Sequence, residues 1–272
     1  CDKFCKFCVV PYTRGPELSR PLQEIKEEAI QLVNNGSMEI ILLGQNVNAY
    51  NYKKYRLSDL IYTLSEIKNL KRIRYTTSHP KDFTEDLVKA HDNIEKLMPL
   101  IHLPVQSGSN KILKKMNRKH TVEEYIKIIS KLKKFDKKIE FSSDFIIAYP
   151  GETENDFNNT LKLLKEIKYI NSYSFIFSAR PGTPSANLKK IDNTIAKKRL
   201  MVFQEEADKI KNNFRKKLIG EELEVLFENR VKQQNIFFGR DRYFNAVVVK
   251  SDIDLKGKIK AVKINHFNSN TL

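Results

Sequence analysis

All three cysteines of the chain lie within its first eight residues, at Cys1, Cys5 and Cys8. This spacing places three thiols on one short loop. Cysteine thiolates are ligands of iron–sulfur clusters. Three of them can hold three irons of a [4Fe–4S] cluster and leave the fourth iron open to another ligand, so the spacing predicts a site at which chemistry takes place.

Two other uses of the cysteines fit the sequence less well. A disulfide framework pairs its cysteines, and three leave one over in a chain of 272 residues, which is large enough to fold without covalent cross-links. A structural zinc site takes four ligands. Its fourth ligand would have to come from a distant residue such as His79 or His102.

The chain is strongly basic, with 49 lysines and arginines against 33 acidic residues and a formal net charge of +16. The excess of basic residues is largest in residues 111–138 and 186–217. Such a charge favours a polyanionic partner, and nucleic acid is the partner that we expect. Helix faces that are charged only for solvation are the alternative.

The sequence contains no run of eighteen apolar residues and no N-terminal secretion signal. We therefore expect a cytoplasmic protein without a membrane partner. No Met precedes Cys1, so we also expect the chain to be a piece of a longer polypeptide.

Short apolar runs alternate with helical patterns along most of the chain. The runs are rich in Ile, Val, Phe and Tyr, which is typical of buried parallel strands. Thr121 followed by Glu124 has the form of a capping box and predicts a helix start. Repeated strand–helix units predict an α/β fold, a partial TIM-type (β/α) barrel. The expected strands are 38–43, 73–77, 101–105, 141–147 and 173–177, and the expected helices are 22–34, 57–67, 84–91, 111–116, 121–135 and 154–167.

Each expected strand is followed by small or polar residues that can bind a polar ligand. In a parallel barrel the loops after the strands meet at one end and build the active site. Gly, Ser, Asn and Pro also simply make turns, but their recurrence after every strand predicts one polar binding site at that end. The loops are 44–48, 78–80, 106–109, 149–153 and 178–183.

The sequence pattern changes after a basic helix that ends near Lys217. Short alternating runs joined by turns predict a small all-β barrel over residues 218–272, separate from a barrel domain over residues 1–217. Basic and aromatic groups there can contact an RNA backbone and stack on bases, although aromatic side chains also fill such barrels. The candidate RNA-binding residues of this segment are Arg230, Lys232, Arg240 and Arg242, beside Tyr243 and Phe244.

Five segments together resemble a known family. They are residues 1–15 (CDKFCKFCVVPYTRG), 19–21 (SRP), 42–50 (LLGQNVNAY), 102–109 (HLPVQSGS) and 180–184 (RPGTP). This set resembles the radical S-adenosylmethionine methylthiotransferases over nearly the whole chain. The GQNVNAY stretch favours the MiaB-type branch, which acts on tRNA, over relatives that act on a ribosomal protein or on threonylcarbamoyladenosine.

The resemblance implies the cofactors and the reaction. Cys1, Cys5 and Cys8 would bind a site-differentiated [4Fe–4S] cluster whose open iron takes S-adenosylmethionine. One electron, from a donor such as flavodoxin or ferredoxin, then splits the sulfonium into methionine and a 5′-deoxyadenosyl radical. The family uses this radical to add a methylthio group at C2 of N6-dimethylallyladenosine, next to the anticodon at position 37 of tRNA. A second S-adenosylmethionine supplies the methyl group.

The resemblance also suggests which side chains bind the cofactor and the RNA, with no catalytic residue beyond the cluster ligands. The loop after the second strand of such barrels contacts the methionine part of the cofactor, which points to Gln45 and Asn46. Asp144 interrupts an apolar run, so it either binds the cofactor or forms a salt bridge. In the family, the C-terminal position holds an RNA-binding TRAM domain. The further cofactor candidates are Ser78, Gln106 and Ser107, and the further RNA candidates are Arg14, Arg20 and Arg180.

The chain departs from the family in three respects. Family members have an N-terminal domain with three cysteines for a second [4Fe–4S] cluster, for which this chain has no ligands, and the strand expected before Cys1 is absent. Ala148 and Ala179 stand where glycine and proline are common. We expect the isolated chain to be unable to complete methylthiolation. A single-cluster radical enzyme with another reaction and a non-catalytic RNA-binding remnant are the alternatives.

Overall fold

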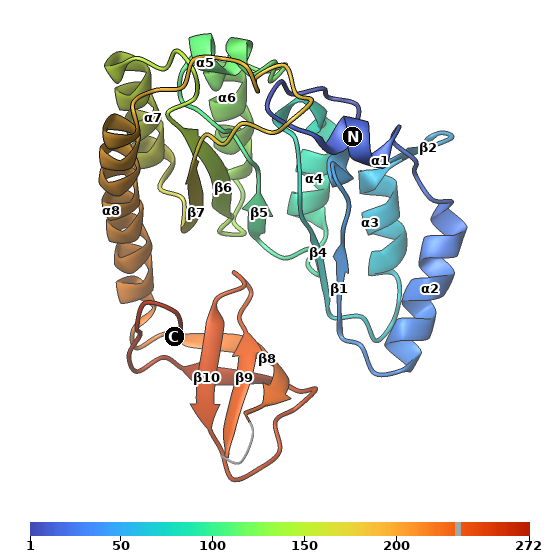
Figure 1. Cartoon of the computed structure of the whole chain (residues 1–272). Coiled ribbons are helices and arrows are strands. Elements are labelled where there is room, and N and C mark those ends of the chain that lie inside the picture. Colours follow the sequence, from blue (N-terminus) through green and yellow to red (C-terminus); the bar gives the residue numbers. More distant parts are fainter. Residues whose placement is uncertain (232–234) are drawn as a thin grey trace.

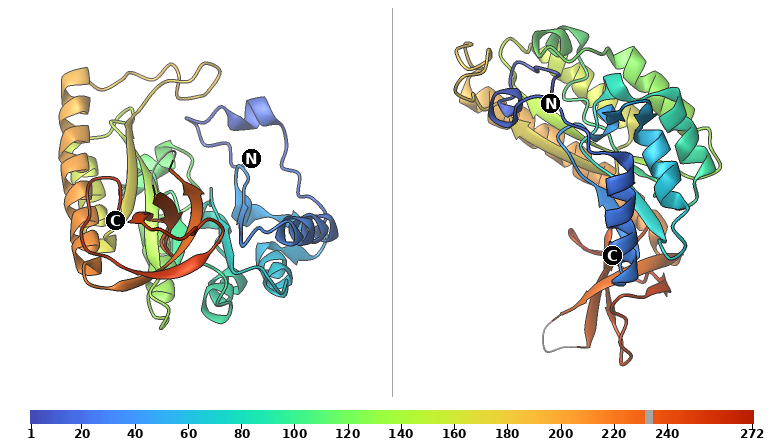
Figure 2. Two further views of the ribbon diagram at one scale, coloured as in Figure 1. Left: turned by 90° about the horizontal axis from the view of Figure 1, so that it is seen from below. Right: turned by 90° about the vertical axis from the view of Figure 1, so that its right-hand side faces the viewer.

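The computed structural model describes residues 1–231 and 235–272 (Figure 1). A curved row of parallel strands with helices on its outer side forms the larger part, and a small antiparallel β-structure lies at the lower end of the strands. The view from below in Figure 2 shows the strands as an arc rather than a closed ring. The α/β class and the partial barrel are as expected from the sequence.

Five parallel strands form the wall of the partial barrel. β1 pairs with β4, and β5, β6 and β7 pair in sequence order. Among the described residues, an isolated bridge between Ile73 of β4 and Leu97, three residues before β5, connects the two groups. The strands are β1 (Glu39–Leu42), β4 (Arg72–Tyr75), β5 (Leu100–His102), β6 (Glu140–Ile147) and β7 (Asn171–Ile176), and a separate hairpin consists of β2 (Asn51–Tyr52) and β3 (Tyr55–Arg56).

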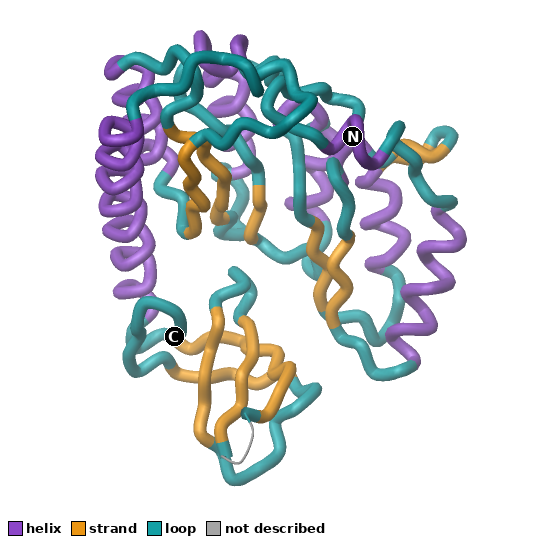
Figure 3. The backbone as a smooth tube through the Cα atoms, in the orientation of Figure 1, coloured by secondary structure: helices purple, strands orange, loops and turns teal. Residues whose placement is uncertain are grey.

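Helices cover the outer side of these strands, as Figure 3 shows. Thr121 and Glu124 form a capping box at the start of α6, and Thr153 and Asp156 form one at the start of α7. The helices are α1 (Val10–Arg14), α2 (Leu22–Asn34), α3 (Leu57–Ser65), α4 (Glu85–Asn93), α5 (Asn110–Lys115), α6 (Val122–Leu132), α7 (Glu154–Ile167) and α8 (Asn193–Leu218), with 3₁₀ turns η1 (Val47–Ala49) and η2 (Pro80–Asp82). No helix within the described ranges is both long and apolar enough to span a membrane.

The apolar core lies between the strands and these helices. It includes side chains from every layer of the barrel, among them the fully buried Ile61, Leu64 and Phe145. The hydroxyl of buried Tyr125 donates to the carbonyl oxygen of Leu103 at 2.9 Å, which satisfies its polar end inside the core. This core fixes where the strands end, and therefore where the strand-end loops meet.

The C-terminal segment forms a curled antiparallel sheet with its own core, consistent with the small barrel that we expected. Its strand order is β10-β9-β8-β11, and Val225, Phe227 and Phe237 are buried within it. A Cβ at Gly239 would lie 2.5 Å from the carbonyl oxygen of Leu226, so only glycine fits where these strands cross closely. The strands are β8 (Glu222–Arg230), β9 (Ile236–Arg240), β10 (Ala246–Lys250) and β11 (Ile259–Lys263).

Two arginines of β4 attach this sheet to the amino ends of the barrel strands. Arg72 donates to the carbonyl oxygens of Arg240 and Glu224 at 2.8 and 2.9 Å. Arg74 donates to those of Arg242 and Asp241 at 3.0 and 2.9 Å. Both side chains are buried, so these four charge-assisted hydrogen bonds hold the two parts of the chain in a fixed arrangement.

Every strand and helix expected from the sequence is present, with ends shifted by at most three residues. The sequence did not predict the short α1, the two 3₁₀ turns or the β2–β3 hairpin. These elements are too short to show a hydrophobic period, which is the signal on which the prediction relied.

Candidate active site

The cysteine loop is attached to the barrel by neighbours on three sides. The amide of Lys6 donates to the carbonyl oxygen of Met116 at 2.9 Å, and the Asn117 side chain donates to that of Phe4 at 2.8 Å. The Lys3 ammonium pairs with Asp82 at 2.7 Å. The loop therefore lies across the carboxyl ends of the strands, where α5 and η2 begin or end (Figure 1).

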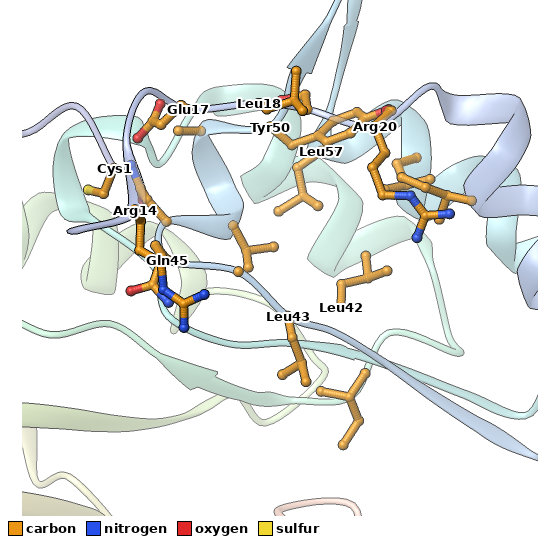
Figure 4. A pocket seen from close by; sticks show the side chains of 18 of the residues that line it. Cys1, Arg14, Glu17, Leu18, Arg20, Leu42, Leu43, Gln45, Tyr50 and Leu57 are labelled. Atoms are coloured by element: carbon orange, nitrogen blue, oxygen red, sulfur yellow. The ribbon is translucent and has the colours of Figure 1, made fainter. Parts of the chain in front are cut away.

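A pocket of about 500 Å³ opens beside this loop. Figure 4 shows Cys1, Arg14 and Gln45 at one end of the pocket and Arg20 at the other, with Leu42 and Leu43 between them. Asn46 also lines it. The structure thus brings together one predicted cluster ligand, two predicted cofactor-binding residues and two predicted RNA-binding arginines.

Two predicted cofactor-binding side chains carry buried polar atoms that have no hydrogen-bond partner among the described residues. They are Oδ1 of Asn46 and Oγ of Ser78. The other end of the Asn46 amide donates to Asp82 at 2.7 Å, which fixes the oxygen in place as a free acceptor. Buried polar atoms are normally hydrogen-bonded, so these two indicate a site built for a polar ligand.

Gln106 and Ser107 belong to a tight turn after β5. Gln106 has φ +74°, an uncommon value for a residue other than glycine. The hydroxyl of Ser107 accepts from the amide of Ser109 at 3.2 Å and lies 3.4 Å from the hydroxyl of Thr160. The Ser107 side chain therefore already has partners in the turn.

Asp144 has a different environment from the one expected. Its side chain is 34% exposed, and its carboxylate lies 3.5 Å from Nε2 of His102 rather than beside a lysine or arginine. Both residues line a second cavity of about 650 Å³, which β10 and α8 also border. Asp144 does not line the pocket that holds Gln45 and Asn46, although Ile41 and Leu43 line both cavities.

Comparison with known proteins identifies the superfamily. The sequence pattern of the radical SAM superfamily matches residues 1–164. The chain belongs to the radical SAM superfamily. It is 56% identical, over its whole length, to the tRNA-2-methylthio-N(6)-dimethylallyladenosine synthase of Pelagibacter ubique, and 50% identical to the protein of that name from Wolbachia pipientis subsp. Culex pipiens. It spans 62% and 63% of the lengths of these relatives.

Solved structures of radical SAM enzymes share the fold at low sequence identity. The methyltransferase TsrM from Kitasatospora setae gives a TM-score of 0.57 at 16% identity over 68% of this chain and 37% of its own. Coproporphyrinogen III oxidase HemN from Escherichia coli gives 0.55 at 12% identity over 89% of this chain and 64% of its own. These likenesses support the partial barrel and say nothing further about the reaction.

Membership of the radical SAM superfamily implies a [4Fe–4S] cluster and S-adenosylmethionine, and the donor set fits both. Three thiols on one anchored loop suit a cluster, and the unpartnered atoms of Asn46 and Ser78 suit the polar groups of the cofactor. Among residues 1–231 and 235–272, no three His, Cys, Asp or Glu side chains, those of the three cysteines included, are grouped as they would be around one metal ion.

The predicted RNA-binding residues fall into two groups at opposite ends of the strands. Arg14, Arg20 and Arg180 are exposed near the carboxyl ends, and Arg20 pairs with Glu28 at 2.7 Å. Arg230, Arg240 and Arg242 belong to the C-terminal sheet at the amino ends. Lys232 lies outside the described residues.

The aromatic residues beside this second group are occupied within the fold. The phenol of buried Tyr243 donates to the carbonyl oxygen of Lys138 at 2.9 Å. The ring of Phe244 has the guanidinium of Arg240 at 4.2 Å and that of Arg74 at 4.8 Å from its centre. Both rings therefore already have partners from the barrel part of the chain.

The sequence did not predict a polar cluster under the cysteine loop. His79 and His120 are buried with ring centres 5.6 Å apart, and burial together with the nearby charge of Arg118 lowers their pKa values to about 2 and about 3. Both are therefore neutral at physiological pH. Arg118 itself contacts Cys5. The only sequence signal for this contact is that Arg118 follows the helix at 110–115 by three residues. Arg118 and Cys5 are too far apart in the sequence for their contact to be predicted.

Proposed function

We propose that this chain is the radical-generating and RNA-binding part of a tRNA methylthiotransferase that modifies C2 of N6-dimethylallyladenosine at position 37. The observation that carries the proposal is the 56% identity, over the entire chain, to a protein of that name. The anchored cysteine loop and the strongly basic composition support it. The three cysteines serve one cluster, so a second cluster would need ligands from elsewhere.

In this proposal Cys1, Cys5 and Cys8 would hold the cluster and leave one of its irons available to S-adenosylmethionine. When bound, cluster and cofactor supply a reductive cleavage that yields a carbon radical, with the electron coming from flavodoxin, ferredoxin or a similar donor. The protein contributes position and exclusion of water.

The side chains of the strand-end loops orient the cofactor. Asn46 presents its Oδ1 as an acceptor because Asp82 holds the other end of the amide. Ser78 offers a hydroxyl that can donate or accept. Gln45 lies beside Cys1, and Leu42 and Leu43 supply part of the apolar wall of the pocket. Gln106, Ser107 and Asp144 are the remaining candidates, and Ser107 and Asp144 already have partners within the protein.

RNA contacts follow the two groups of arginines in this proposal. Arg14, Arg20 and Arg180 would hold RNA phosphates near the reacting base, since the guanidinium fork suits phosphate. Arg230, Lys232, Arg240 and Arg242 would bind the RNA further away, as in a TRAM domain over residues 218–272 following the barrel domain over 1–217. The protein would act in the cytoplasm.

Anaerobic reconstitution tests the cluster. We expect about four irons and four sulfides per chain, an electron paramagnetic resonance signal after reduction, and 5′-deoxyadenosine on addition of S-adenosylmethionine. Cys5→Ala should lose all three signals while its far-ultraviolet circular dichroism stays unchanged. A wild-type chain that holds one zinc and no iron would refute the proposal.

Binding of an anticodon stem-loop tests the RNA part. The Arg14→Ala/Arg20→Ala double variant should bind more weakly and lower the slope of log affinity against log salt by about 0.7–0.9 for each phosphate that the protein no longer neutralises. The Lys127→Ala/Lys162→Ala double variant, which also removes two charges from exposed helix faces, is the matched control. If binding weakened equally in both variants, the effect would come from net charge alone and not from a specific site.

A further inference from the structure

Arg118 places a buried guanidinium against one cysteine of the loop. Its Nη1 lies 3.6 Å from Sγ of Cys5, and its Nη2 donates to the carbonyl oxygen of Pro104 at 2.6 Å. Arg118 is 6% exposed and Cys5 is 7% exposed. Cys5 is also the most buried of the three cysteines, so water competes little for its sulfur.

The position of Arg118 is set by the same segment that holds the loop. Met116 and Asn117 bind the backbone on both sides of Cys5, at Lys6 and Phe4. The amide of Arg118 donates to the carbonyl oxygen of Leu113 at 2.9 Å, which continues the end of α5. The guanidinium therefore faces the sulfur because three consecutive residues are fixed against the loop.

The charge of Arg118 has no carboxylate partner among the described residues. Lys3, also next to the loop, is compensated by Asp82 at 2.7 Å. The neighbouring His79 and His120 are neutral and supply no negative charge. A buried cation without a counter-charge is costly, so Arg118 requires an anion nearby. A ligating thiolate of Cys5 is that anion.

We propose that Arg118 raises the reduction potential of the cluster by donating a hydrogen bond to the Cys5 thiolate. The inference rests on the cluster site proposed above. One-electron reduction by an external donor adds a negative charge to the cluster, and a fixed cation and a hydrogen bond to sulfur stabilise the reduced form more than the oxidised form. Arg118 acts through Cys5 and is thus a positioning residue rather than a catalytic one.

A potentiometric titration of the reconstituted chain, followed by electron paramagnetic resonance, tests this proposal. Arg118→Met should lower the equilibrium constant for reduction about tenfold, which is about 59 mV for a one-electron couple. Arg118→Lys keeps the charge and should recover part of the difference. Lys115→Met removes an exposed charge three residues earlier, at the end of α5, and should leave the potential unchanged. An unchanged potential in Arg118→Met, or an equal shift in Lys115→Met, would overturn the proposal.

A measurement on the wild-type chain covers the case in which Arg118→Met does not fold. Electron–nuclear double resonance of the reduced cluster should show a strongly coupled exchangeable proton that disappears in deuterated water. A cluster without such a proton would overturn the role of Arg118 alone. A wild-type chain without iron would overturn the cluster site itself, and so separates the two proposals.

Discussion

The two ends of the barrel strands differ in whether the buried polar side chains that we highlight have hydrogen-bond partners. At the amino ends, Arg72 and Arg74 are buried and together donate to four carbonyl oxygens of the C-terminal sheet. At the carboxyl ends, Asn46, Ser78 and His120 are fully or partly buried with atoms that lack partners in the described structure. Among the described residues, Oγ of Ser172 and Nε of Arg215 lack partners near the amino ends as well, but the two arginines that join the parts of the chain are satisfied there, whereas side chains next to the cysteine loop are not.

This difference distinguishes residues that stabilise the fold from residues that are available to bind a ligand. A satisfied buried network stabilises the fold, and an unsatisfied one lowers stability until a ligand completes it. Substitutions at the amino end should therefore cost stability, and substitutions at the carboxyl end should cost binding.

The largest effect should come from Arg74→Ala at the amino end. This change removes two hydrogen bonds to the C-terminal sheet and leaves the carboxylate of Glu39, 3.0 Å away, buried without its cation. We expect a decrease of about 3–5 kcal/mol in the free energy of unfolding, measured with guanidinium chloride. Arg242→Ala is the control, because its carbonyl oxygen remains as the acceptor and its side chain is exposed. Similar decreases in both variants would break the comparison.

Acidification should destabilise the carboxyl end. Burial and the charge of Arg118 lower the pKa of His120 to about 3, below the ordinary value of 6.5. Between these two pH values His120 is protonated in the unfolded chain but neutral in the folded chain. Stability therefore falls as the pH falls below about 6.5, by up to about 2 kcal/mol at about pH 5 from this residue. His120→Gln should remove that part of the pH dependence in the apoprotein. A wild-type and a variant curve that run parallel would contradict the assignment.

A smaller effect distinguishes binding from stability at one serine. Ser78→Ala removes a hydroxyl that has no partner among the described residues, so the free energy of unfolding should change by less than about 0.5 kcal/mol. The Kd of S-adenosylmethionine, measured by calorimetry on the reconstituted chain, should rise roughly 5–10-fold.

Ser143→Ala is the matched control for this serine. Its buried hydroxyl accepts from the amide of Val105 at 3.0 Å and donates to the carbonyl oxygen of Leu103 at 3.1 Å. The variant should be less stable by about 1–3 kcal/mol and keep its affinity for the cofactor. The opposite pattern in the two variants would show that Ser78 belongs to the fold.

The smallest effect concerns Ala148, which stands where the family resemblance led us to expect glycine. Its φ of +58° is left-handed, which costs an alanine about 1–2 kcal/mol. Ala148→Gly removes that strain but adds freedom to the unfolded chain, so we expect a net gain of about 0.5 kcal/mol in the free energy of unfolding. Gly151→Ala, at φ +81° in the same loop, should be less stable than the wild type. A destabilised Ala148→Gly would show that the strain is compensated elsewhere.

The sequence predicted the strands and helices well because each buries an apolar face with a clear period. It predicted the positions of the polar loops for the same reason, since those loops follow from where the strands end. It did not predict which loop side chains lack partners. Asp82 orients the amide of Asn46, and Arg118 contacts the sulfur of Cys5. The residues of each pair are distant in the sequence and are brought together only by the fold. Asp144 shows the same limit, because its partner His102 comes from a neighbouring strand.

Helix α8 connects the two ends of the strands with a fixed length. Near its start Arg199 pairs with Glu152 and Glu154 after β6, and near its end Arg215 donates to the carbonyl oxygen of Asn268 in the C-terminal segment. Its 26 residues make a rod of about 39 Å. One inserted residue would lengthen the rod by about 1.5 Å and turn its far end by about 100°. The number of residues in α8 therefore sets both how far the C-terminal sheet lies from the start of the helix and the direction in which the sheet faces.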